Sequence, residues 1–470
     1  MFKVFSSNIS KQFWKLIFNS WAWKCCSLLT VQQIIDASST IWLVMMMKNI
    51  VSGESFFFSF SLYLFTLAFT YIPGCFSRIS CIHWQQEAQR SFVNNFVDVN
   101  RNQIGEWNNK AIKEEKLSVL TSEGPQAINA WITYVYDLYS YVISVFFNIM
   151  ALSIVVEPLF ACAYAFSVLV VIFVIRFKYR IQRKLTQKAL TARIDLTQSL
   201  LAAWDNVLLG NFYNFKIWQD KTNQRINRCL LKNIEVERFD QILAILISLI
   251  TSIPSLSVVV YYVYLHRFDV PSLTAFLVTL PILFTILSYT YQTLSLIFRW
   301  TMHRSKLFAI YKAIQPIEEP HLAMTKKIKW PKIHLASSTE QLQENEPTQV
   351  HTLSSYEDLL THTAQAGRIT LRGENGSGKS TLLMLVKNSF CDRAFFLPTH
   401  NQLSFVAETN KYSTGESLRN RLLEILEMVD VDILLLDEWD ANLDNDNQTK
   451  LSALIDKLAK KKCVIEVRHR

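Results

Sequence analysis

The sequence predicts a bundle of six membrane-spanning α-helices with long cytoplasmic helical extensions, followed by a compact α/β domain. Half of the 470 residues are hydrophobic and only 19% are charged, so the chain is more apolar than most soluble proteins. Six segments are long and apolar enough to cross a bilayer, which takes about 20 residues each. After the last of them, strand-like and helical runs alternate, as they do in α/β folds.

The predicted domain boundaries follow these changes in composition. Residues 1–24 carry four lysines among aromatic side chains, which predicts an amphipathic helix at the membrane surface. Residues 25–312 form the six-span domain, and a linker at 313–327 contains two prolines. Residues 328–470 form the α/β domain. The six spans are predicted near 27–47, 56–73, 138–156, 158–177, 242–265 and 273–298.

Positive charge decides the predicted orientation of the spans. Lysine and arginine number four in 1–24, six in 73–137 and twelve in 178–241, whereas each intervening connection holds at most one. An excess of these residues marks the cytoplasmic side, so both termini are predicted to be cytoplasmic. Membrane-flanking charge also accounts for the net charge of +9, and we expect no nucleic-acid partner. The eight cysteines lack metal-like spacing and are expected to be free thiols.

The two long cytoplasmic connections have a helical rather than a loop composition. A structureless loop of about 64 residues would be unusual, so the spans are predicted to continue as helices beyond the membrane. Their turns are expected near 102–113 and 205–219. The second turn is rich in aromatic residues, and two interpretations remain open: a surface patch that binds a soluble domain, or packing within the helical hairpin.

Asp36 lies within the first predicted span. A carboxylate in a span usually faces a cavity or a partner. Asp36 could line a substrate path with Gln32 and Gln33, or the span could be shifted so that Asp36 lies near one face of the bilayer. The sequence leaves both interpretations open.

A glycine-rich loop at 373–381 fits the phosphate-loop pattern G-x-x-x-x-G-K-[ST]. It follows a strand-like run and opens a helical one, so backbone N–H groups and the helix N-terminus can bind a phosphate; a chance glycine turn is the alternative. Lys379 is predicted to reach the outer phosphates of a nucleotide, and the Ser380 hydroxyl to bind Mg²⁺. The predicted nucleotide-binding residues are Gly373, Glu374, Asn375, Gly376, Ser377, Gly378, Lys379, Ser380 and Thr381.

A second motif completes the predicted site. The apolar run 433–436 ends in Asp437 and Glu438, which is typical of the acidic half of a phosphate-loop ATPase site. Asp437 is predicted to bind Mg²⁺, and Glu438 to polarise the attacking water. His469 follows the next strand-like run and could sense the γ-phosphate; a surface Asp-Glu pair and a terminal His without a role are the ordinary alternatives.

Together these motifs resemble the ABC transporters of the exporter type, in the half-transporter arrangement of six spans followed by one ATP-binding domain. The resemblance covers essentially the whole chain. Residues 412–416 (Tyr-Ser-Thr-Gly-Glu) are similar to the signature of that family, usually Leu-Ser-Gly-Gly-Gln, and Ser413 lies 24 positions before Asp437. Residues 117–124 are similar to the stretch after the first coupling helix, and His469 matches the switch histidine. Trp439, with Ser-Thr-Gly in the signature, weakly resembles the cyclic-peptide exporter branch.

The resemblance implies a dimer in which each ATP lies between one phosphate loop and the signature of the partner, where Ser413 and the backbone of Gly415 contact the γ-phosphate. It implies ATP and Mg²⁺ as cofactors, a lipid environment in a bacterial-type inner (plasma) membrane, and export by alternating access of a small or amphipathic substrate, for example a peptide, lipid or drug. A homodimer is expected. The alternatives are a heterodimeric exporter, or an ATP-binding membrane sensor or regulatory subunit without independent transport.

The chain also departs from the family. Only 32 residues separate Ser380 from Ser413, so the helical subdomain that grips the coupling helices is expected to be reduced. The usual Gln ligand of Mg²⁺ is not found, and Glu408 is its predicted replacement, with Gln402 second. The aromatic residue that stacks on adenine is not identified: Tyr356 and Trp330 are the candidates.

Overall fold

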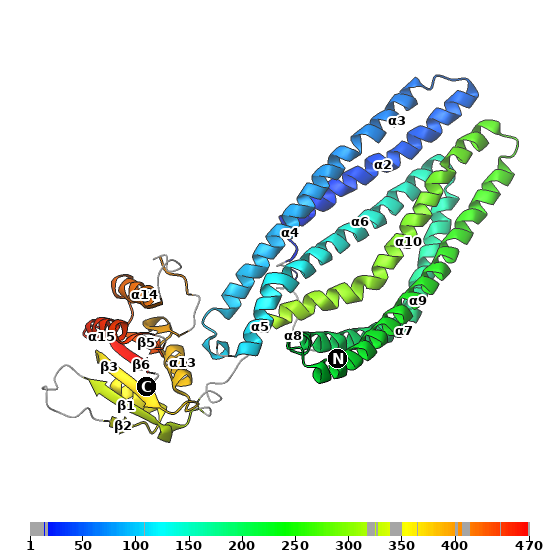
Figure 1. Ribbon diagram of the computed structural model, residues 1–470. Helices are drawn as coiled ribbons and strands as arrows, with labels where there is room; N and C mark the ends of the chain where they lie inside the picture. Colours follow the sequence, from blue (N-terminus) through cyan, green and yellow to red (C-terminus); the bar gives the residue numbers. More distant parts are fainter. Residues whose placement is uncertain are drawn as a thin grey trace. The chain divides into compact units, whose positions relative to one another are not determined.

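The computed structural model divides the chain into two compact units (Figure 1). One contains Met1–Phe96 and Ser118–Ile314, and the other contains Val97–Leu117 and Gln315–Arg470. We call them the helical unit and the sheet unit. The described residues are 14, 17–107, 109–316, 325, 328–338, 350–363, 365–399, 403–406, 414–441 and 443–468.

Long helices make up the helical unit. Six helical stretches of the described chain are long and apolar enough to cross a membrane, which confirms the predicted number of candidate spans. The longest helix has 54 residues and is about 80 Å long at 1.5 Å per residue, far more than the ~30 Å hydrocarbon core. The helices are α2 (Ser20–Ser52), α3 (Phe57–Phe69), α4 (Tyr71–Asn100), α6 (Gly124–Val155) after the π-helical turn η2 (Val119–Glu123), α7 (Leu159–Leu201), α8 (Ala203–Leu208), α9 (Phe212–Leu265) and α10 (Val270–Ala313).

The first helix starts earlier than the sequence predicts. The side chain of Asn19 accepts hydrogen bonds from the backbone N–H groups of Trp21 and Ala22, so it caps α2 at Ser20. The predicted surface helix over 1–24 therefore overlaps α2 at its end, and the rest of it, apart from 14 and 17–19, lies outside the described residues.

Both predicted cytoplasmic turns are present between helices. The first lies between α4 and α5 (Lys110–Ser118) and contains η1 (Ile104–Glu106), and the second lies between α7 and α9 and contains α8. α7 and α9 run side by side (Figure 1). At the second turn, Trp204, Phe212 and Tyr213 are 75%, 76% and 75% exposed, so the aromatic patch predicted there is on the surface.

A six-stranded mixed sheet forms the centre of the sheet unit. The strand order is β2-β1-β3-β6-β5-β4; β1 is antiparallel to β2 and β3, and the other neighbours are parallel. The strands are β1 (Ile333–Ser338), β2 (Val350–Thr352), β3 (Gly367–Gly373), β4 (Ala394–Leu397), β5 (Ile433–Asp437) and β6 (Cys463–Val467). The helices are α12 (Tyr356–His362), α13 (Lys379–Phe390), α14 (Thr414–Met428) and α15 (Asn445–Ala459), with short turns η3 (Trp330–Lys332) and η4 (Cys391–Arg393).

Alternation along β5 places apolar residues on both faces of this sheet. Ile433 and Leu435 pack in the cluster that contains α13, whereas Leu434 and Leu436 pack in the cluster that contains α14 and α15. A strand that is buried on both faces has a continuous apolar sequence, and for this reason the apolar run 433–436 predicted a strand at the position of β5.

The first turn belongs to the sheet unit. The ring of Trp107 packs edge-on against Phe396 of β4, with 5.6 Å between ring centroids and an interplanar angle of 81°. Beside it, Glu106 and Lys116 form a buried ion pair, and the Lys116 ammonium also donates to the Asn100 side chain at 2.7 Å. Residues 97–117 are therefore joined to the sheet by an aromatic contact and stiffened by a buried charge pair.

Candidate nucleotide site

The loop that follows β3 has a backbone that requires glycine. Gly376 and Gly378 have φ angles of +77° and +98°, in the left-handed region that L side chains rarely adopt. A Cβ atom at Gly373 would lie 2.3 Å from the carbonyl oxygen of Lys332, so η3 can approach the loop only if this residue is glycine. The three glycines of the predicted motif thus each have a structural reason.

Lys379 closes the loop on itself. Its ammonium donates hydrogen bonds to the carbonyl oxygens of Gly373 and Glu374, at 2.7 and 3.2 Å, and Lys379 begins α13. Within the loop, the hydroxyl of Ser377 is buried and has no hydrogen-bond partner among the described residues. A buried hydroxyl with unused bonding capacity fits a loop that receives a polar ligand.

The two predicted motifs meet at Ser380. Its hydroxyl donates a hydrogen bond of 3.0 Å to the Asp437 carboxylate, across 57 positions of sequence. The sheet topology explains this contact. β3 and β5 are both parallel to β6, which lies between them, so the loop after β3 and the end of β5 lie at the same end of the strands. Burial raises the pKa of Asp437 above its usual range, although the Ser380 bond and the Lys379 charge act in the opposite direction.

Glu438 follows Asp437 in a strained backbone conformation. Its φ is +44°, unusual for a residue other than glycine, and its N–H donates to the Val467 carbonyl of β6 at 2.9 Å. The carbonyl of Asp437 accepts a hydrogen bond of 2.7 Å from the Thr399 hydroxyl. The chain therefore turns sharply at the end of β5, next to the strand that leads to His469.

Five other predicted positions are not part of this geometry. Ser413, Glu408 and His469 lie outside the described residues, as does Gln402. Gly415 lies in the first turn of α14. The structure thus brings together the glycine-rich loop, Asp437 and Glu438, and the roles of all the predicted site residues stay predictions.

The two aromatic candidates for adenine stacking both pack against the core on the α13 side of the sheet. The Tyr356 hydroxyl donates to Ser389 at 2.6 Å, and burial raises the pKa of Tyr356 despite that bond. Trp330 lies in η3, and Lys332 at the end of η3 closely approaches Gly373 of the glycine-rich loop. Neither placement selects one of the two residues.

A buried charge network behind the site was missed by the sequence analysis. Glu466 of β6 is fully buried, and its carboxylate accepts hydrogen bonds from the guanidinium of Arg368 at 2.8 and 3.1 Å and from the hydroxyl of Thr370 at 2.8 Å. The same Arg368 guanidinium bonds to Ser452 and Asp456 of α15, at 2.9 and 2.6 Å. The network therefore ties β3, β6 and α15 together.

This network includes the sequence neighbours of both predicted catalytic residues. The indole N–H of Trp439, which follows Glu438, donates to the Glu466 carboxylate at 2.8 Å. Arg468, which precedes His469, donates to the same carboxylate at 2.8 Å and stacks over the Trp439 ring. Burial alone would raise the pKa of Glu466, but the Arg368 and Arg468 charges hold it below its usual range. One signal was visible in the sequence: Glu466 is the single charged residue within the apolar run 463–467.

No known protein family matches this chain, and no curated protein is significantly similar to it. The functional argument therefore rests on the geometry of the loop at 373–381 and of the end of β5. That geometry joins a glycine-rich loop, a helix N-terminus, a hydroxyl and a carboxylate at the carboxyl ends of the parallel strands β3 and β5.

Proposed function

We propose that this protein is an ATP-driven membrane exporter of the ABC type that works as a dimer. The observation that carries the proposal is the 3.0 Å hydrogen bond between the Ser380 hydroxyl and the Asp437 carboxylate, formed where a glycine-rich loop opens α13. Six candidate spans in the same chain supply the membrane part. A phosphate loop joined to spans is suited to drive movement across a membrane.

The residues at this edge fit magnesium as well as phosphate. Mg²⁺ prefers oxygen ligands and is usually held by one or two protein groups together with phosphates and water. The Ser380 hydroxyl and the Asp437 carboxylate are two such oxygens in contact. Bound Mg²⁺ supplies positive charge that neutralises the phosphates.

The chain's own groups have distinct tasks in the proposed reaction. Backbone N–H groups of the loop and the N-terminus of α13 bind the phosphates, and Lys379 exchanges its bonds to loop carbonyls for bonds to phosphate oxygens. The Glu438 carboxylate orients the attacking water and accepts its proton. Trp439 and Arg468, both bonded to Glu466, hold the chain directly after Glu438 and directly before His469.

Two surfaces support coupling and dimerisation. Residues 97–117 pack on the sheet through Trp107 and Phe396, which gives the ATP site a mechanical connection to the helix that follows this turn. The second turn leaves Trp204, Phe212 and Tyr213 exposed on the single chain. Exposed aromatic side chains in a contiguous stretch are typical of interfaces, so we assign them to contacts with a second copy.

The test is ATP hydrolysis by the full-length protein in proteoliposomes, across a panel of candidate peptides, lipids and amphipathic drugs. Replacement of the general base by Glu438→Gln is expected to lower turnover by at least about 100-fold while ATP binding remains. The matched control is Glu427→Gln, an exposed glutamate of α14, which is expected to keep wild-type turnover. Equal activity of Glu438→Gln and wild type would refute the proposed catalytic role.

A membrane sensor that binds ATP without transport is the second candidate. It is favoured by one observation: only 32 residues separate Ser380 from Ser413, which leaves little chain for a subdomain that transmits closure to the spans. The same proteoliposomes distinguish the two. A sensor would bind ATP, and lose that binding in Lys379→Ala, but no substrate would change its hydrolysis rate; hydrolysis that begins only when a second protein is added would indicate a heterodimer.

A further inference from the structure

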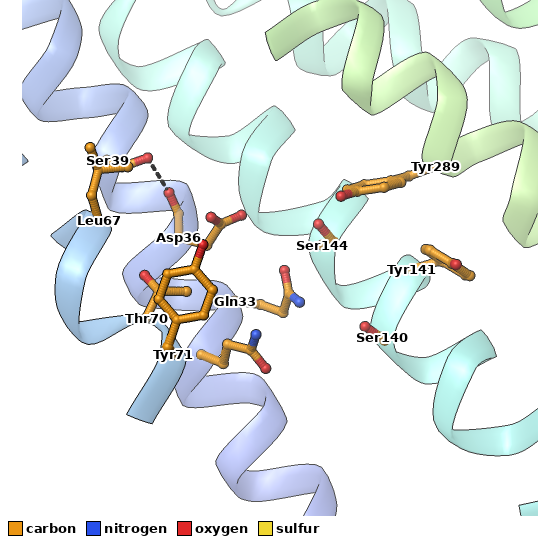
Figure 2. A pocket seen from close by; sticks show the side chains of 11 residues that line it. Gln33, Asp36, Ser39, Leu67, Thr70, Tyr71, Ser140, Tyr141, Ser144 and Tyr289 are labelled. Carbon is orange, nitrogen blue, oxygen red and sulfur yellow. Dashed lines mark hydrogen bonds between the residues drawn. The ribbon is translucent and has the colours of Figure 1, made fainter. Parts of the chain in front are cut away.

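A polar cavity lies among the candidate spans of the helical unit. It has a volume of about 260 Å³ and is bounded by residues of α2, α3, α4, α6 and α10, with Thr70 between α3 and α4 (Figure 2). Most of its lining residues carry amide, hydroxyl or carboxylate groups, although the helices around it are strongly apolar. Polar groups inside a span are unfavourable unless they have a function, so this cavity is a candidate binding site.

The wall formed by α2 carries an acidic group without a cationic partner. Asp36 forms no salt bridge with any described residue, and its carboxylate faces the space between α2 and α6 (Figure 2). One turn earlier, Gln33 is only 8% exposed, and its amide oxygen has no hydrogen-bond partner among the described residues. The Asp36 carboxylate bonds to the side chain of Asn148 on α6 but has no cation beside it. With the unpaired Gln33 oxygen on the same cavity, this wall is attractive to a hydrogen-bond donor with positive charge.

The opposite wall carries two tyrosines. Tyr141 of α6 and Tyr289 of α10 both line the cavity, with ring centroids 5.5 Å apart and an interplanar angle of 43°. Figure 2 shows them across the cavity from Asp36, with Ser144 between. Aromatic faces attract ammonium and guanidinium groups, and they do so more strongly where water is scarce.

We infer that this cavity binds the positively charged head group of an amine or guanidinium compound, held between the Asp36 carboxylate and the two tyrosine rings. An anion is disfavoured by Asp36, and a tightly held divalent metal would need more than one carboxylate. The volume lies just below the range of about 300–1,000 Å³ that encloses whole drug-sized ligands, so a head group fits rather than a large molecule. That the bound compound is also the transported substrate rests on the proposed exporter function.

Equilibrium binding to the full-length protein in lipid nanodiscs, measured by calorimetry without ATP, tests the inference. Three probes share one scaffold and differ in charge: 2-phenylethylammonium, its neutral N-acetyl derivative and 3-phenylpropanoate. The cation is expected to bind at least about tenfold more tightly than the other two, since a charge pair in a partly desolvated site is strongly attractive. Equal affinity for the cation and the neutral probe, or no binding of any probe, overturns the inference.

Variants of the acidic wall sharpen this test. Asp36→Asn is expected to remove the tenfold preference for the cation, whereas Asp36→Glu retains it because the charge remains. Asp137→Asn on α6 is the matched control, a half-buried carboxylate outside the cavity lining, and should bind like wild type. If the Asp36→Asn protein elutes as a folded protein and still prefers the cation to the same extent, the inference is overturned.

Two further variants separate the cavity from the ATP site. A Cβ atom at Gly74 would lie 2.8 Å from the Gln32 amide nitrogen, so Gly74→Ala must displace that amide at the cavity wall and is expected to weaken cation binding several-fold. Lys379→Ala, in the other unit, should leave cation binding unchanged. A wild-type protein that binds the cation but does not hydrolyse ATP would therefore refute the exporter and not the cavity. Weakened cation binding in Lys379→Ala would contradict the assignment of binding to this site.

Discussion

Glu466 in the sheet unit and Asp36 in the helical unit are both carboxylates carried by strongly apolar elements, and their partners differ completely. Glu466 is surrounded by donors: Arg368, Arg468, Thr370 and Trp439 all bond to its two oxygens. Asp36 lines a polar cavity and has no salt bridge with a described residue.

The difference distinguishes a carboxylate that stabilises the fold from a carboxylate that can bind a ligand. A buried carboxylate whose bonding capacity is filled by its own chain holds elements together and has no capacity left for a ligand. A carboxylate left without a cation in a span is unfavourable to the fold, and such groups are retained where they have a function. The comparison thus predicts opposite consequences of removing the two charges.

The largest expected effect is the loss of the Glu466 carboxylate. Glu466→Ala should destabilise the sheet unit by about 3–5 kcal/mol, because the buried Arg368 charge loses its main partner. Denaturant unfolding followed by tryptophan fluorescence measures this, since Trp439 bonds directly to the removed group. Glu427→Gln on the exposed side of α14 should change stability by less than about 0.5 kcal/mol. A Glu466→Ala protein as stable as that control would remove the distinction drawn above.

The pH dependence of stability tests the same carboxylate without changing the fold. Because the native pKa of Glu466 lies below its unfolded value, its stabilising contribution is present above that unfolded value and is lost as pH falls through the native pKa. The stability difference between wild type and Glu466→Gln should therefore be constant near neutral pH. It should shrink only below about pH 4.3, the usual glutamate value. A difference that shrinks between pH 8 and 6 would implicate another group.

Asp36→Asn is expected to act in the opposite direction. Asp36 has no cation partner, so removing its charge should leave the stability of the ligand-free protein unchanged or raise it by about 0.5–2 kcal/mol. Replacing a functional group often stabilises a protein in this way. Differential scanning calorimetry of wild type and Asp36→Asn in the same nanodiscs measures it. A loss of several kcal/mol would place Asp36 with Glu466 as a structural charge.

The smallest effect concerns the edge of the sheet unit. A double-mutant cycle of Trp107→Ala and Phe396→Ala should give a coupling energy of about 0.5–1.5 kcal/mol between the two rings. Hydrogen exchange of residues 97–117 measures the local stability in each variant of the cycle. Trp204 at the second turn is 75% exposed, and Trp204→Ala should leave this exchange unchanged. Purely additive effects of the first pair would show that residues 97–117 do not depend on the ring contact.

Local patterns of the sequence were sufficient for much of this molecule. The six candidate spans were predicted because a bilayer demands about 20 apolar residues in a row, a property read without tertiary contacts. β5 was predicted because both of its faces are buried and its sequence at 433–436 is wholly apolar. The glycine-rich loop was predicted from its residue pattern at 373–381, and Gly376 and Gly378 in it have backbone angles that other residues rarely adopt.

The sequence alone therefore determined the candidate spans, the strands β3, β5 and β6 and the glycine-rich loop, since each depends on neighbours in the chain. Only the tertiary structure decided that Ser380 meets Asp437, that Glu466 binds Arg368 from another strand, and that Asp36 lines a cavity with Tyr289 from a distant helix. These pairings depend on strand order, register and helix packing. Such long-range geometry is set by the burial of the whole core and leaves no local periodic pattern in the sequence.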